Sequence, residues 1–112
     1  MPRYRYVTFT EPKAGQDAAY NDWYTNQHVH DVMAIPGIDS AQRFERVDVD
    51  GQPTTLPRYL ALYEWETDDV EGVKREIMAR AGTPQMPITD SMDGSKHAAH
   101  IYREISERIT SD

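Results

Sequence analysis

Polar and hydrophobic residues alternate in three segments of the chain, as they do in β-strands that bury one face. Strand-forming Tyr, Val, Thr and Phe fill 3–10, and a second alternating segment covers 40–49. The most apolar segment is 58–66, with the sequence RYLALYEWE, and we expect it to form a central strand. A fourth strand is predicted over 97–105.

Helical periodicity covers two other segments. Residues 16–35 contain no Gly or Pro, and the Pro-Gly pair that follows ends a predicted helix of about five turns. Its apolar residues recur at helical spacing, namely Ala19, Tyr20, Trp23, Tyr24, Ala34 and Ile35. A second helix is predicted from Val70, after Thr and Asp residues that can cap it, to Gly82. A loop over 83–96 leads to the last strand.

This order of elements, strand-helix-strand followed by strand-helix-strand, is typical of the ferredoxin-like α+β fold. We predict one domain over 1–112, since domains most often contain roughly 100 to 150 residues. An antiparallel sheet of four strands would then be covered on one face by the two helices.

Both faces of the predicted third strand carry large apolar side chains. Tyr63 and Trp65 point to one face, whereas Leu60 and Leu62 point to the other, and the two helices can cover only one of these faces. A second copy of the same sheet, packed face to face about a two-fold axis, is the simplest cover for the exposed one. We therefore expect a homodimer.

Composition and charge exclude several classes of protein. The 19 acidic and 12 basic residues give a formal net charge of −7 at pH 7, which repels nucleic acid and anionic membrane surfaces. Without Cys there is no disulfide, thiolate nucleophile or iron–sulfur cluster. The first residues do not resemble a signal peptide, and no apolar run is long enough to span a membrane. We expect a cytoplasmic protein with no nucleic-acid or membrane partner.

The densest group of chemically capable side chains lies within the first predicted helix. His28 is four residues from Tyr24 and three from Asp31, so their side chains can meet on one face. A carboxylate beside an imidazole raises its pKa and orients its ring, as a general base or acid requires. His30 lies closer to the centre of the apolar arc, so the periodicity does not choose between the two histidines. The pair cannot chelate one metal ion, since helical residues two apart point about 200° apart.

Further candidates for a substrate site lie on the helix and the predicted sheet. Trp23 and the sheet aromatics Tyr63 and Trp65 are predicted to form apolar walls. Arg43, on the second strand, is a candidate for binding an anionic substrate. His97 and His100 are an odd number of residues apart, so at most one faces a pocket. The chain has no phosphate-binding glycine loop, serine-hydrolase elbow or zinc-protease motif.

Three parts of the sequence together resemble the EthD-like family of the dimeric α+β barrel superfamily. They are the segments NDWYTNQHVHDV (21–32), IPGI (35–38) and AQRF (41–44), with YLALYE (59–64) similar to that family's third strand. The resemblance implies a ferredoxin-like homodimer with a pocket between helices and sheet, and it favours His28 over His30. The superfamily also contains haem-degrading enzymes, cofactor-free monooxygenases, cyclases, dehydratases and lyases, so the fold does not choose a reaction.

The expected function is that of a small enzyme without a cofactor, which acts on a hydrophobic, aromatic small molecule by proton transfer. It would be a lyase, dehydratase, isomerase or cyclase. His28 would be the base or acid, Asp31 its orienting partner and Tyr24 a donor to a substrate oxygen, while Trp23 and His30 would help to bind the substrate. The alternatives are a cofactor-free or haem-dependent monooxygenase, and a non-catalytic, stress-associated dimer that binds a small molecule.

Overall fold

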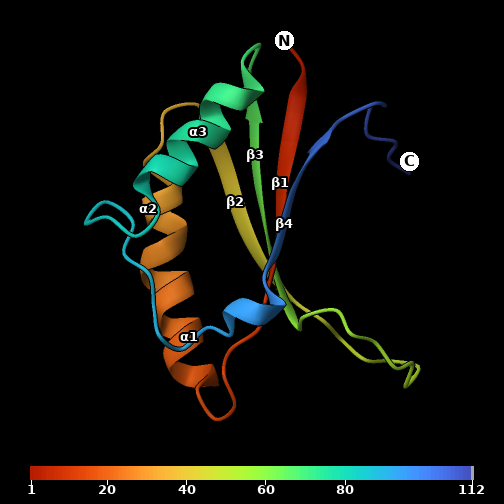
Figure 1. The fold of residues 1–112 in the computed structure, drawn as a ribbon. Coiled ribbons are helices and arrows are strands. Elements are labelled where there is room, and N and C mark those ends of the chain that lie inside the picture. Colours follow the sequence, from red (N-terminus) through yellow and green to blue (C-terminus); the bar gives the residue numbers. More distant parts are fainter. Residues whose placement is uncertain (112) are drawn as a thin grey trace.

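A computed structural model describes residues 1–111, and its centre is one antiparallel sheet with strand order β2-β3-β1-β4. The strands are β1 (Arg3–Thr10), β2 (Ile38–Glu45), β3 (Tyr59–Glu66) and β4 (Ala98–Arg103). The helices lie on one side of this sheet (Figure 1). The predicted ferredoxin-like α+β fold is therefore confirmed.

The first predicted helix is present, but it is not α-helical throughout. It consists of α1 (Asp17–Trp23), a π-helical turn η1 (Tyr24–His28) and α2 (Val29–Met33). The second helix is α3 (Val70–Arg80). The side chain of Asp69 accepts a hydrogen bond of 2.9 Å from the backbone N–H of Gly72, which caps the start of α3 as predicted.

Two strands differ in length from the prediction. β2 covers Ile38–Glu45. It begins earlier than predicted because a bulge between Ile38 and Ser40 lets Ile38 pair with Trp65 of β3. Beyond it, the chain leaves the sheet in a long exposed hairpin, which Figure 1 shows projecting below the strands. β4 is three residues shorter than the predicted 97–105, because His97 precedes the strand and the pairing with β1 stops at Arg103.

The core lies between the helices and one face of the sheet. β3 is central, as predicted, and its helix-facing residues Tyr59, Ala61, Tyr63 and Trp65 are all buried. Tyr20 and Tyr24 of the first helical segment pack against them. Aromatic side chains thus dominate this core, and each buried Tyr must place its hydroxyl group against a polar partner.

The opposite face of the sheet carries no helix. Val7 and Phe9 of β1 lie beside Leu62 and Leu60 of β3 on this face, and all four are only partly buried. Phe44 of β2 is 40% exposed. The predicted excess of apolar side chains on this face is therefore present, and a second copy of the chain remains the cover that we propose for it.

Candidate functional site

The first feature of the candidate site is a face-to-face stack of Trp23 and His28. Their ring centroids are 4.6 Å apart and the ring planes differ by 20°. In an α-helix, residues five apart point about 140° away from each other. The π-helical turn Tyr24–His28 is wider and brings residues five apart into line. The rings of Tyr24 and His28 form a T-shaped pair, with centroids 4.9 Å apart and an interplanar angle of 84°.

The predicted pairing of His28 with Asp31 is wrong. Within residues 1–111, the buried atoms His28 Nδ1 and Asp31 Oδ2 each lack a hydrogen-bond partner, so the two side chains are not bonded to each other. The physical reason is the π-helical turn, which directs the imidazole back onto Trp23. Two buried polar atoms without partners destabilise the free protein.

The pKa of His28 is shifted in the opposite direction to the one predicted. Burial, the nearby positive charge of Arg43 and the nearby His97 together lower it to about 4, and burial has the largest effect. Because no carboxylate compensates for the loss of water, the imidazole is neutral at neutral pH.

The sequence placed His30 near the centre of the helix's apolar arc, and the structure corrects this position. His30 is exposed, and so is Ala19, the residue on which the predicted apolar arc was centred. The buried face is instead centred on Tyr20 and Tyr24, which are 0% and 3% exposed. Alanine is a poor marker of a buried face because its small side chain gains little from burial. Of the two candidate histidines, the structure thus places His28 inside.

The hydroxyl group of Tyr24 belongs to a buried hydrogen-bonded chain. Tyr63 donates to Tyr24 at 3.5 Å, Tyr24 is 3.1 Å from Thr8 Oγ1, and Thr8 in turn donates to the backbone oxygen of Ala61 at 3.4 Å. Burial raises the pKa of Tyr24, and that of Tyr63 lies well above its usual value, so both hydroxyls stay protonated. Tyr24 therefore already has partners inside the protein, which differs from its predicted role as a donor to substrate.

The two sheet aromatics predicted as pocket walls lie in the core. Trp65 is 0% exposed and packs against Tyr4 and Tyr6, and Tyr63 is 1% exposed. Their position on the helix-facing side of the central strand explains their burial. Trp23, by contrast, is only partly buried, and its indole N–H donates to the backbone oxygen of Pro87 at 3.3 Å. The loop 83–96 thereby packs against the site from outside.

Arg43 joins β2 to the helix that carries the site. Its guanidinium lies 4.4 Å from the centre of the Tyr24 ring, a cation–π distance. It also donates to Thr25 Oγ1 at 2.7 Å and to Asn21 Oδ1 at 3.0 Å. The predicted anion-binding residue is thus engaged within the protein, and its charge faces the aromatic cluster.

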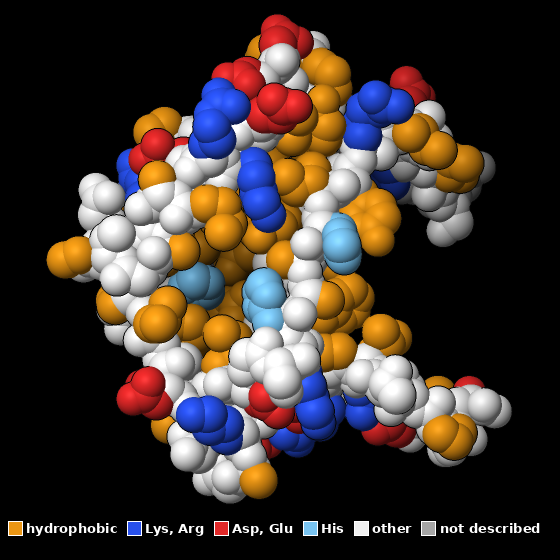
Figure 2. Space-filling view, in the orientation of Figure 1, with side chains coloured by type: hydrophobic (Ala, Val, Ile, Leu, Met, Phe, Trp, Pro, Cys, Tyr) orange, Lys and Arg blue, Asp and Glu red, His pale blue; other side chains and the backbone are white. Residues whose placement is uncertain are grey.

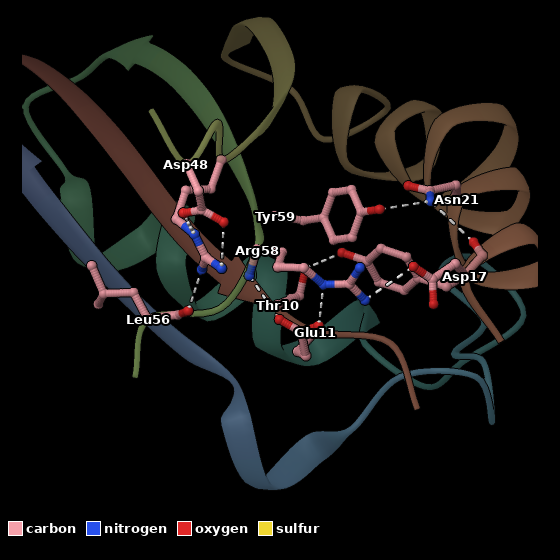
Figure 3. Close-up of polar contacts among 10 residues, drawn as sticks. Thr10, Glu11, Asp17, Asn21, Asp48, Leu56, Arg58 and Tyr59 are labelled. Carbon is pink, nitrogen blue, oxygen red and sulfur yellow. Dashed lines mark hydrogen bonds and ion pairs between the residues drawn. The ribbon is translucent and has the colours of Figure 1, made fainter. Parts of the chain in front are cut away.

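A polar cluster fixes the start of α1 on the sheet (Figure 3). Arg58 pairs with Glu11 at 2.6 Å and with Asp17 at 3.0 Å, and the Asn21 amide donates to the Tyr59 hydroxyl at 3.3 Å. The guanidinium of Arg58 also lowers the pKa of Glu11, although burial opposes this. These contacts set the position of the helix on which the site is built.

The space-filling view shows a hollow between the helices and β4 (Figure 2). Hydrophobic side chains form its floor, and histidine side chains lie along its walls. His97, which immediately precedes β4, is close enough to influence the pKa of His28.

No group of three or more His, Asp or Glu within 1–111 is arranged to hold a metal ion. No helix of the described chain is long and apolar enough to cross a membrane.

Three participants in the site were not predicted from the sequence. They are Thr8, the loop 83–96, and Lys74, which together with burial lowers the pKa of His97. Thr8 has the same parity as the buried Tyr6 on β1, so strand alternation was the signal available for it. Lys74 lies four residues after Val70, beside the apolar stripe of α3. The packing of the loop has no signal in the sequence that we can identify.

The fold and the site define the chain as a ferredoxin-like domain with a histidine and aromatic cluster between helix and sheet. No model of a known protein family matches it, and no curated protein is similar to it in sequence.

Solved structures, however, share its fold. A candidate monooxygenase from Shewanella loihica matches with a TM-score of 0.63 and 15% identity, over 96% of this chain and 99% of that one. The haem degrader MhuD from Mycobacterium tuberculosis, solved with two haems in its active site, gives 0.62 and 18%, over 94% and 98%. An EthD family protein from Bacillus halodurans gives 0.54 and 16%, over 94% and 100%. The predicted resemblance is thus confirmed at the level of the fold.

Proposed function

We propose that the protein is an enzyme that acts on a hydrophobic small molecule by proton transfer to His28. The observation that carries this proposal is the state of His28: partly buried, neutral, stacked on Trp23 and with Nδ1 unbonded within 1–111. A neutral imidazole is the form that is able to accept a proton from a substrate. Structural relatives that include a candidate monooxygenase and a haem degrader support an enzyme of small molecules.

The low pKa of His28 restricts the chemistry. A base is most effective when its pKa lies near the working pH, so a base with a pKa of about 4 suits a proton that is already acidic. Among carbon-bound hydrogens, those between two carbonyl groups come closest to this requirement, because both carbonyls delocalise the charge of the resulting carbanion. Loss of such a proton starts an isomerisation, elimination or cyclisation, so a lyase, dehydratase, isomerase or cyclase without a cofactor is the leading class.

Trp23 and Tyr24 position His28 in this proposal. Trp23 supports the flat face of the imidazole, and the Tyr24 ring packs against it in a T-shaped arrangement. The hydrogen bonds of Tyr24 to Thr8 and from Tyr63 fix that aromatic ring in turn. The proposal does not rely on Asp31, which forms no hydrogen bond or ion pair with His28 within 1–111.

A haem-dependent oxygenase is the second candidate, and His28 is again the observation that favours it. Neutral imidazole is the form that ligates haem iron, and the lowered pKa of His28 keeps its imidazole neutral. His28 would hold the iron, and bound haem would supply oxygen chemistry. Titration with haem separates this candidate from the first, since wild type should shift the Soret band and His28→Ala should not.

The experiment that tests the leading proposal is a turnover screen of aromatic carbonyl compounds with wild type, His28→Ala and His30→Ala. We expect His28→Ala to lower turnover by roughly 10² to 10⁴, the usual contribution of a positioned base. His30→Ala removes the same chemical group from an exposed position and should keep full activity. Compounds that raise the melting temperature without being converted would indicate a non-catalytic binder instead.

A further inference from the structure

Positive side chains converge on a groove between α3 and β4. The groove has a volume of about 560 Å³ and one carboxylate, that of Glu71, on its walls. Its positive residues are Lys74 and Arg75 from α3 and Arg103 from β4. Its apolar residues are Tyr4, Val70 and Ile101. A groove with apolar walls and a positive rim fits a molecule that is apolar at one end and anionic at the other.

These charges are poorly compensated, although the chain is acidic as a whole. The net charge is −7, yet within 1–111 no carboxylate lies at ion-pair distance from Lys74 or Arg103. Arg75 pairs with Asp69 at 3.8 Å, and both side chains are 70% exposed. Exposed pairs of this kind contribute little. The groove therefore retains the positive charge that a ligand anion would meet.

Lys74 is held in place at the inner side of this groove. Its ammonium group donates to the Tyr6 hydroxyl at 3.2 Å and lies 4.6 Å from the centre of the Tyr6 ring. An ammonium group has three hydrogens, so others remain for a ligand. A cation that is already positioned loses less side-chain entropy when it binds an anion.

The groove and the histidine site lie on the same face of the sheet. Burial and the positive charge of Lys74 lower the pKa of His97, and His97 contributes to the lowered pKa of His28. Tyr6 and Ile101 are paired neighbours on the helix-facing side of β1 and β4. Lys74, which bonds Tyr6, and the helix that carries His28 therefore lie on the same side of the sheet.

We propose that Lys74 binds the carboxylate of an apolar acid whose body extends along the sheet toward His28. This inference rests on the proposed function only for what happens at His28. It adds a substrate class, namely aromatic or aliphatic carboxylates, and a residue that selects it. The recognition is electrostatic at one end of the molecule and apolar along the rest.

The experiment compares two probes of nearly equal shape, 2-naphthoate and the neutral 2-naphthamide, by isothermal titration calorimetry on the full chain. Wild type should bind 2-naphthoate at least about tenfold more tightly, as expected for one charge-assisted hydrogen bond. Lys74→Met keeps the apolar stem of the side chain and should lose this preference. Lys13→Met removes an exposed lysine that does not line the groove and should retain it.

Two further variants keep the result interpretable. Arg103→Gln, at an exposed position on β4, should weaken 2-naphthoate but not 2-naphthamide, so the inference is testable even if Lys74→Met folds poorly. His28→Ala should leave the preference intact, which separates this inference from the proposed function. Equal affinity of wild type for both probes, or an unchanged preference in Lys74→Met, would overturn it.

Discussion

Trp23 and His28 lie face to face because the π-helical turn Tyr24–His28 begins directly after Trp23. This relationship determines the chemistry of the site. The stack removes the imidazole from water and from Asp31, so burial is the main influence on the His28 pKa. π-helical turns are uncommon and are found frequently at functional sites. Here the turn converts a predicted charged pair into a neutral, buried base.

The first prediction concerns the pH dependence of stability. The unfolded chain binds a proton at His28 near pH 6.5, whereas the folded protein does so only near pH 4. The contribution of His28 is therefore fully present above pH 6.5 and is lost as the pH falls toward 4, by on the order of 3 kcal/mol. His28→Gln cannot bind this proton, so its free energy of unfolding should fall less over the same range.

Urea unfolding at fixed protein concentration, between pH 7 and pH 4, measures this difference. His30→Gln is the matched control, since His30 is exposed and should leave the wild-type pH dependence unchanged. Parallel curves for wild type and His28→Gln would show that the pKa of His28 is not lowered by burial.

The second prediction concerns the pH dependence of catalysis. A base with a pKa of about 4 in the free enzyme stays neutral from pH 8 to about pH 5, so kcat/KM should be constant over that range. Initial rates at low substrate concentration provide the measurement. A fall in kcat/KM centred near pH 6.5 would identify a solvent-exposed histidine as the base, contrary to our assignment.

The third prediction concerns the buried hydroxyl chain. Tyr24→Phe removes the oxygen that accepts from Tyr63 and bonds Thr8 Oγ1. We expect a loss of about 1 to 3 kcal/mol in the free energy of unfolding, because a buried hydroxyl is left without its partner. Tyr102→Phe, at a position that is 60% exposed, is the control and should change stability by less than about 0.5 kcal/mol. Equal stability of the two variants would mean that the chain contributes nothing.

The fourth prediction concerns the uncovered face of the sheet. Light scattering should give about twice 12.9 kDa, because a second sheet would bury Val7, Phe9, Leu60 and Leu62 over an interface above roughly 1,000 Å². Leu62→Lys places a charge at the centre of that face and should produce monomers. Met78→Lys, at a position on α3 that is 60% exposed, should remain dimeric. A wild-type monomer at micromolar concentration would exclude the dimer.

Local patterns in the sequence were sufficient for the fold. The alternation over 3–10 and 58–66 predicted strands that agree with the structure to within one residue, because alternate side chains of a strand point to opposite faces. The acidic cap at Asp69 and the apolar stripe of α3 predicted the second helix in the same way. These features depend on neighbours that are close in the sequence.

The candidate site depended on the tertiary structure. A helical wheel assumes a constant rotation per residue, and the π-helical turn at Tyr24–His28 breaks that assumption where the chemistry lies. The sequence determined that an aromatic helix with two histidines crosses the sheet. Packing against Trp23, the charge of Arg43 and the position of His97 decided that His28 is the buried, neutral one, because burial and electrostatic fields depend on residues that only folding brings together.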